Sequence, residues 1–100
     1  MRFCPWYPLA QAGEHAPDGE NVLQLRVADG LIDYPTGKSA MVRYSHATDA
    51  RMLATRWAAE LSSHALLCRH LEIVDGDCAA LTAKLLAEFT RRFGAEPSLP

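Results

Sequence analysis

The stretch Asn21-Val22-Leu23-Gln24-Leu25-Arg26-Val27 determines how the rest of the chain is interpreted. Its apolar residues alternate with the polar residues Gln24 and Arg26. Successive side chains of a strand point to opposite faces of a sheet, so this alternation predicts a strand with one buried face. We therefore expect the fold to be built on a sheet that includes this stretch.

The segment that follows is expected to return the chain to the same sheet. Turns are predicted at Ala28-Asp29-Gly30 and at Tyr34-Pro35-Thr36-Gly37, because Gly, Pro and Asp favour turn conformations. A second strand is predicted from Ser39 to Ser45. The two strands are expected to pair as a hairpin with a long connection.

From Thr48 onward the spacing of apolar residues lengthens to four, which is typical of a helix. Either Thr48 or Asp49 is the predicted N-cap, because short polar side chains accept hydrogen bonds from the first free amides. The residues that define this apolar stripe are Leu53, Trp57 and Leu61.

The last part of the chain is expected to add a third strand and a second helix. The strand is predicted between Leu66 and Val74, and the helix from about Cys78 to Phe93. Asp77 is placed to cap the helix and Gly94 to end it. The predicted fold class is α+β, with a three-stranded, mainly antiparallel sheet and two principal helices in the order β-β-α-β-α.

Residues 1–20 are expected to form an extended N-terminal arm. Three prolines are incompatible with a regular helix there: Pro5, Pro8 and Pro17. An aromatic cluster lies at the start of the arm: Phe3, Trp6 and Tyr7. We expect these rings to pack onto the domain, and the alternative is that they form an exposed partner site.

The size and charge of the chain limit its function class. One hundred residues is the usual size of one domain, here with residues 21–94 as sheet and helices and residues 95–100 as a tail. The net charge of −2 argues against broad electrostatic binding of nucleic acid. No apolar run approaches the ~20 residues needed to span a membrane, and no signal peptide is recognisable. We expect a cytoplasmic protein without membrane association.

Cysteine usage indicates neither disulfides nor a metal site. Cys4, Cys68 and Cys78 lack the paired spacing of disulfide frameworks or zinc sites. We therefore expect free thiols, no structural metal and no cofactor.

Arginine dominates the basic residues, because eight of the ten are Arg. The planar guanidinium group suits paired hydrogen bonds to carboxylates or phosphates. Four of these residues lie on the predicted hairpin and the helix after it, and they are expected to line one concave face that attracts anions. The alternative is that they are scattered over solvated surface. The four are Arg26, Arg43, Arg51 and Arg56.

Several segments, in this order, form a pattern that is similar to that of one family. They are Asn21–Leu25, Met41–Ser45, a helical Arg at 51 or 56, Ala80–Phe89 and Pro97–Pro100. Together they resemble a GIY-YIG nuclease domain over residues 17–100. In that family two strands carry signature triplets, a helix carries a catalytic Arg, a later helix carries a metal-binding Glu, and a short segment closes the domain.

The departures from this family pattern fall at its catalytic positions. Arg43 stands where a Tyr is expected and Ser45 where a Gly is expected. Lys84 occupies the place of the metal-binding Glu, and Pro100 that of the closing Asn. A one-metal phosphodiesterase needs a carboxylate to hold Mg²⁺ and an Arg to stabilise developing phosphate charge. The resemblance therefore implies a scaffold that has lost its chemistry.

We expect a non-catalytic module that binds a macromolecular partner, as a small subunit of a larger assembly. The expected partner is a protein, and the expected contact surface joins the four arginines to the aromatic arm. One alternative is an active Mg²⁺-dependent endonuclease that uses Tyr44, Glu88 and either Arg51 or Arg56. Another is a domain that binds nucleic acid without cleaving it.

Overall fold

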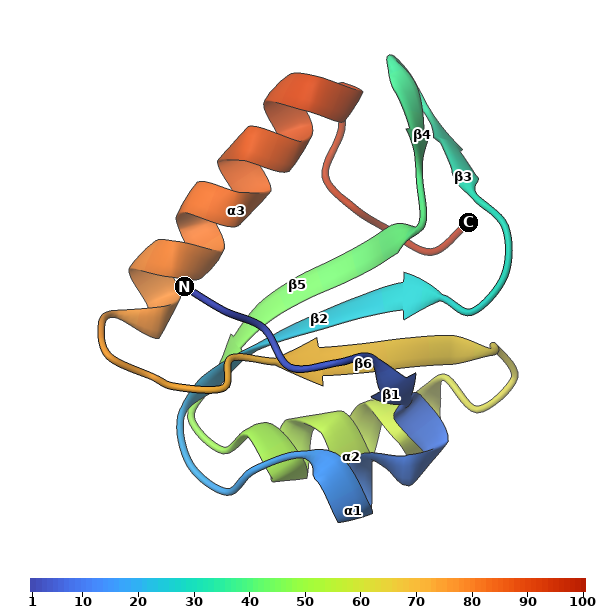
Figure 1. The fold of residues 1–100 in the computed structure, drawn as a ribbon. Helices are drawn as coiled ribbons and strands as arrows, with labels where there is room; N and C mark the ends of the chain where they lie inside the picture. Colours follow the sequence, from blue (N-terminus) through green and yellow to red (C-terminus); the bar gives the residue numbers. More distant parts are fainter.

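A computed structural model describes residues 1–100, and strand β2 (Asn21–Val27) lies at its centre, with the bounds that the alternation predicts. β2 lies between β5 (Met41–Ala47) and β6 (Leu66–His70), and the edge of β6 pairs with the two-residue strand β1 (Tyr7–Pro8) (Figure 1). All three pairings are antiparallel. The α+β class with an antiparallel sheet is thereby confirmed.

The number of strands differs from the prediction. The main sheet has four strands rather than three. The additional strand, β1, was not predicted because it is too short to carry an alternating pattern. A separate hairpin, β3 (Ile32–Tyr34) and β4 (Gly37–Ser39), fills the connection between β2 and β5. Since this hairpin uses Ser39, β5 begins two residues later than the predicted second strand.

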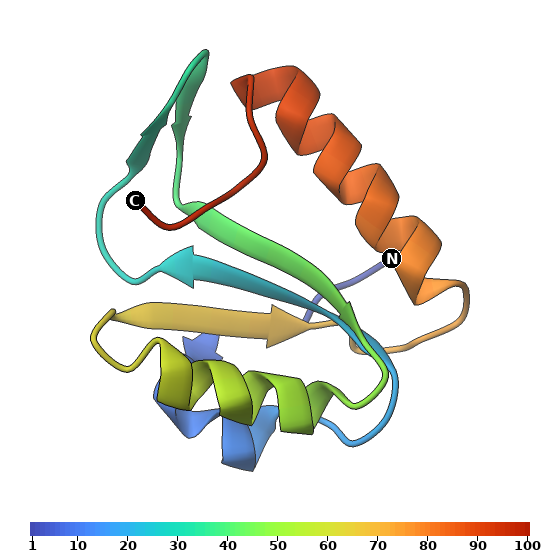
Figure 2. The same ribbon diagram turned by 180° about the vertical axis from the view of Figure 1, so that it is seen from behind.

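Helices cover the two faces of the main sheet unequally. On one face α2 (Ala50–Glu60) packs together with the short helical segments η1 (Leu9–Gln11) and α1 (Ala12–His15). On the other face α3 (Cys78–Phe93) crosses β5 at a steep angle (Figures 1 and 2). The larger core lies on the α2 face, and its fully buried members include Leu23, Leu25, Val42, Cys68 and Ala54.

A second, smaller core joins α3 to the sheet. Val22, Leu71 and Cys78 are buried there, with Phe3, Leu81 and Leu85 packed beside them. Further along α3, the Phe89 ring contacts the rings of Tyr34 and Tyr44 edge-on. Apolar contacts therefore cover the α3 face of the sheet only where α3 itself packs on it.

The predicted helix ends are confirmed. The Asp49 side chain accepts a hydrogen bond from the Met52 amide, and Asp77 accepts one from the Ala80 amide. Gly94 ends α3 with φ of 80°, a left-handed conformation that glycine adopts without strain. No helix combines the length and the apolarity needed to cross a bilayer.

The N-terminal segment differs in part from the extended arm that was predicted for residues 1–20. Residues 9–15 form helical turns, and Pro8 comes directly before them, where a proline ring is compatible with a helix start. The rest of the segment includes an isolated bridge between Phe3 and Leu71, and β1. Tyr7 is buried, whereas Phe3 and Trp6 are partly buried against the α3 face.

Candidate functional site

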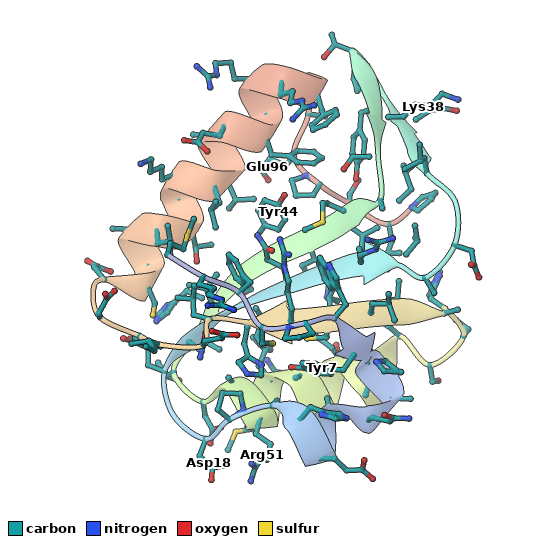
Figure 3. The ribbon with its side chains drawn as sticks, in the orientation of Figure 1. Tyr7, Asp18, Lys38, Tyr44, Arg51 and Glu96 are labelled. Carbon is teal, nitrogen blue, oxygen red and sulfur yellow. The ribbon has the colours of Figure 1, made fainter.

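A row of polar side chains crosses the sheet on the α3 face. In the strand register, Gln24 of β2 lies opposite Tyr44 of β5 on one side and Arg69 of β6 on the other. Directly opposed residues of antiparallel strands share a face, with Cβ atoms about 5 Å apart. The three side chains are therefore neighbours, and Figure 3 shows Tyr44 in the space between α3 and β5.

Arg69 is the centre of this row. Its guanidinium carbon lies 4.7 Å from the centroid of the Phe3 ring and 4.2 Å from that of the Trp6 ring. Its Nε donates a hydrogen bond of 2.7 Å to Oε1 of Gln24. Neither terminal nitrogen, Nη1 or Nη2, has an acceptor in the protein, and neither is sealed from solvent. Two donors of one positioned cation are thus available to a ligand.

The electrostatics of Arg69 are unusual for a folded protein. Burial lowers the pKa of Arg69, while the nearby Tyr44 acts in the opposite direction. The group nevertheless stays cationic, because a guanidinium does not lose its proton in proteins. None of the five ion pairs in the molecule includes Arg69. A partly buried charge without a counter-ion is costly, and the two aromatic rings offset only part of that cost.

A second arginine of the same face extends the site. Arg26 lies opposite Leu67 in the register, so it is a diagonal neighbour of Arg69 on the same face. Its guanidinium carbon lies 5.5 Å from the centroid of the Trp6 ring, and it also forms no ion pair. After burial and other effects, the charge of Arg26 contributes to the lowered pKa of Arg69. We refer to Trp6, Gln24, Arg26, Tyr44 and Arg69 as the arginine site.

A hollow adjoins the arginine site beneath α3. Its volume is about 270 Å³, and Tyr44 forms part of its wall. The remaining wall comes from α3 and combines apolar rings with charged groups. These residues are Leu85, Glu88, Phe89, Arg91, Arg92 and Phe93.

The structure does not bring the four predicted arginines onto one face. Only Arg26 lies on the α3 face. Arg43 lies over the Trp57 ring of α2, at 5.2 Å from its centroid. Arg51 pairs with Asp18 (Figure 3), and Arg56 lies 3.9 Å from Glu60 of its own helix. The register explains Arg43, because it lies directly opposite Leu25 and therefore on the α2 face of the sheet.

The residues predicted for a nuclease site are also separated. Tyr44 and Glu88 line the same hollow, whereas Arg51 and Arg56 belong to α2 on the opposite face. Lys84 is exposed on α3 and does not face the sheet. No group of three or more His, Cys, Asp or Glu side chains is placed to hold a metal ion.

Arg69 and Gln24 are the site residues that were not predicted from the sequence. Tyr7, predicted as a contact residue, is buried, and its hydroxyl lies 3.0 Å from Nδ1 of His70. The sequence did contain an indication of Arg69, because Arg69 is a polar residue that follows an apolar residue in the middle of a predicted strand. What was missing was the register, which sets Arg69 beside Gln24 and beneath the aromatic rings.

Comparison of the chain with protein-family models, with curated proteins and with solved structures finds no match in any of the three.

Proposed function

We propose that this chain is a non-catalytic module that binds an acidic segment of a partner protein at the arginine site. The observation that carries the proposal is the environment of Arg69. Its guanidinium is held between two rings, has no carboxylate partner, and keeps both terminal nitrogens free.

The geometry of a guanidinium group favours a carboxylate as ligand. Two parallel hydrogen bonds from the terminal nitrogens match the two oxygens of a carboxylate. Gln24 and the rings already restrict the Arg69 side chain, so binding costs less rotamer entropy than it would at a mobile arginine. Arg26 adds a second positive charge that attracts a further acidic residue.

The same contacts favour a protein ligand over single-stranded nucleic acid. Such nucleic acid is usually bound by stacking its bases on aromatic rings. At the arginine site the rings of Phe3 and Trp6 are already engaged by guanidinium groups. The net charge of −2 also weakens general attraction to a phosphate backbone.

The composition of the site supports a binding role rather than catalysis. A general base or nucleophile is usually a His, a carboxylate or a thiol. The arginine site contains none of these, and burial raises the pKa of Tyr44 above its ordinary value, so its phenol stays protonated at neutral pH. The endonuclease alternative would also need Arg51 or Arg56, which lie on the far face.

Fluorescence anisotropy with a labelled Glu-rich peptide tests the proposal. The Arg69→Gln variant removes the central cation and is expected to bind at least about tenfold more weakly, since hydrogen bonds to charged groups contribute 1.5–3 kcal/mol. Arg56→Gln removes the same charge from the opposite face, and we expect its affinity to stay within about twofold of wild type.

Two further probes decide whether the proposal holds. A peptide with Gln in place of every Glu is expected not to bind. A single-stranded oligonucleotide that binds more tightly than the Glu-rich peptide would overturn the choice of a protein partner. Equal loss of affinity in Arg69→Gln and Arg56→Gln would overturn the choice of site. Circular dichroism confirms that each variant is folded.

A further inference from the structure

We propose that the arginine site is built for a phosphoryl group, carried by a phosphorylated side chain of the partner protein. The inference rests on the proposed function, because it specifies the ligand of that same site. It is carried by the number and placement of donors that the protein itself leaves unpaired.

Tyr44 provides a further free donor besides the terminal nitrogens of Arg69. Its hydroxyl makes no hydrogen bond within the chain and is not sealed from solvent. Tyr44 and Arg69 flank Gln24 on either side and influence each other electrostatically. The phenol keeps its proton and can therefore donate to an anion that is held by Arg69.

The donors come from three neighbouring strands of the sheet. Arg69 on β6 offers two parallel N–H groups, Tyr44 on β5 offers an O–H, and Arg26 on β2 offers its terminal nitrogens from a diagonal position. A carboxylate has two oxygens in one plane, and Arg69 alone satisfies both. A phosphoryl group has three terminal oxygens in a tetrahedral arrangement, so it can also engage Tyr44 and Arg26.

The positive charge of the site also favours a phosphoryl group as the ligand. A phosphorylated side chain carries a charge of about −1.5 to −2 at neutral pH. Two guanidinium groups without counter-ions match this charge, whereas one carboxylate leaves an excess of one positive charge. Glu88, in the adjoining hollow, is exposed, and Arg91 and Arg92 outnumber it there.

The hollow beneath α3 can hold the part of the peptide next to its phosphorylated residue. Its volume of about 270 Å³ is sufficient for one or two side chains. Its wall has the Phe89 and Phe93 rings on α3 and Tyr44 on the sheet. A peptide whose phosphoryl group is bound at Arg69 can place a neighbouring side chain there.

The test compares three peptides that differ at one position, with phosphoserine, Glu or Ser, by isothermal titration calorimetry, and it includes inorganic phosphate as a fourth probe. The phosphoserine peptide is expected to bind at least about tenfold more tightly than the Glu peptide, because only the phosphoryl group engages all the donors. Inorganic phosphate is expected to bind more weakly than the phosphoserine peptide.

Two variants test whether these donors bind the phosphoryl group. Tyr44→Phe removes only the hydroxyl, and we expect it to weaken binding of the phosphoserine peptide about three- to tenfold, a larger loss than for the Glu peptide. Arg69→Lys keeps the charge but lacks the paired donors, and we expect it to lose most of the preference for the phosphoserine peptide. Arg56→Gln serves as the control on the opposite face.

The outcomes separate this inference from the proposed function. Equal affinity for the phosphoserine and Glu peptides would overturn the phosphoryl inference and leave the acidic-partner proposal standing. Binding of inorganic phosphate alone would show a free-anion site and would overturn both. Absence of binding by all four probes would also overturn both. Phosphoserine binding that is unchanged in Arg69→Lys and Tyr44→Phe would place the ligand elsewhere and overturn the inference.

Discussion

At the scale of single residues, the contact between Tyr7 and His70 fixes the N-terminal segment to the sheet. The Tyr7 hydroxyl lies 3.0 Å from Nδ1 of His70, and the Tyr7 ring stacks on the His15 ring with centroids 4.9 Å apart. Burial raises the pKa of Tyr7, so its phenol keeps its proton at neutral pH. Burial of His70 favours the neutral form of its imidazole.

This arrangement makes stability depend on pH. Burial lowers the pKa of His70 and His15 adds to that lowering, while Glu72 opposes it. The unfolded chain then takes up this proton near the ordinary pKa of about 6.5, and the folded chain only at lower pH. Between about pH 6.5 and the pKa of His70 in the folded state, the free energy of unfolding falls by up to about 1.4 kcal/mol for each pH unit of acidification.

Urea denaturation between pH 7.5 and 5 measures this slope, with His70→Gln to remove the titrating group. We expect the free energy of unfolding of wild type to fall more steeply with acid than that of His70→Gln. His64→Gln is the matched control, since His64 is exposed and its side chain makes no hydrogen bond. Parallel profiles for wild type and His70→Gln would show that His70 titrates alike in both states.

At the scale of elements, Asn21 explains how β2 and β6 stay together beyond their ladder. Its Oδ1 accepts from the Leu71 amide at 2.9 Å and from the Val22 amide at 2.7 Å, and its Nδ2 donates to the Leu71 carbonyl at 3.1 Å. The buried side chain of Asn21 thus takes the place of a strand partner at the residue after β6. The predicted third strand continued to Val74, but β6 ends at His70.

Replacement of Asn21 tests that role. Asn21→Ala leaves both polar groups of Leu71 without a partner in a buried position, and we expect the free energy of unfolding to decrease by about 2–4 kcal/mol. Gln11→Ala removes an exposed side chain without hydrogen bonds and is expected to change it by less than about 0.5 kcal/mol. Urea denaturation of both variants decides, and a similar small effect in the two would contradict the role given to Asn21.

The sequence predicted the elements that carry a strong periodic pattern. The alternation of residues 21–27 and the four-residue spacing after Thr48 gave β2 and α2, and Asp77 with Gly94 gave the bounds of α3. β1, β3 and β4 have two or three residues each, which is too few to show a period. Their pairing depends on tertiary contacts, such as those of the Tyr34 ring with Phe89 and Phe93.

The candidate site was less predictable than the fold, for a physical reason. Trp6 and Arg26 were both named as contact residues from the sequence, and both belong to the arginine site. Arg43 was expected on the same face as Arg26, but it pairs with Leu25 and therefore lies on the opposite face of the sheet. Arg69 can be recognised as a site residue only when β6 is placed beside β2, and the local sequence does not determine that register.

At the scale of the whole molecule, charges that stabilise the fold are separate from charges that are free to bind. Every ion pair includes at least one side chain that is more than half exposed, from 51% in the His46–Glu20 pair upward. Exposed pairs contribute little to stability. Arg26 and Arg69, in contrast, are partly buried and have no acidic partner in the protein.

This separation predicts that salt affects binding and folding differently. Raising NaCl from about 0.05 to 0.5 M shortens the screening length from more than 10 Å to less than 8 Å, which weakens attraction between the arginine site and an acidic peptide. We expect the affinity for the Glu-rich peptide to fall at least about fivefold. The free energy of unfolding is expected to change by less than about 1 kcal/mol, because screening removes only exposed pairs. Peptide titration and urea denaturation in the same buffers measure both, and stability that falls as steeply as affinity would mean that the paired charges hold the fold together.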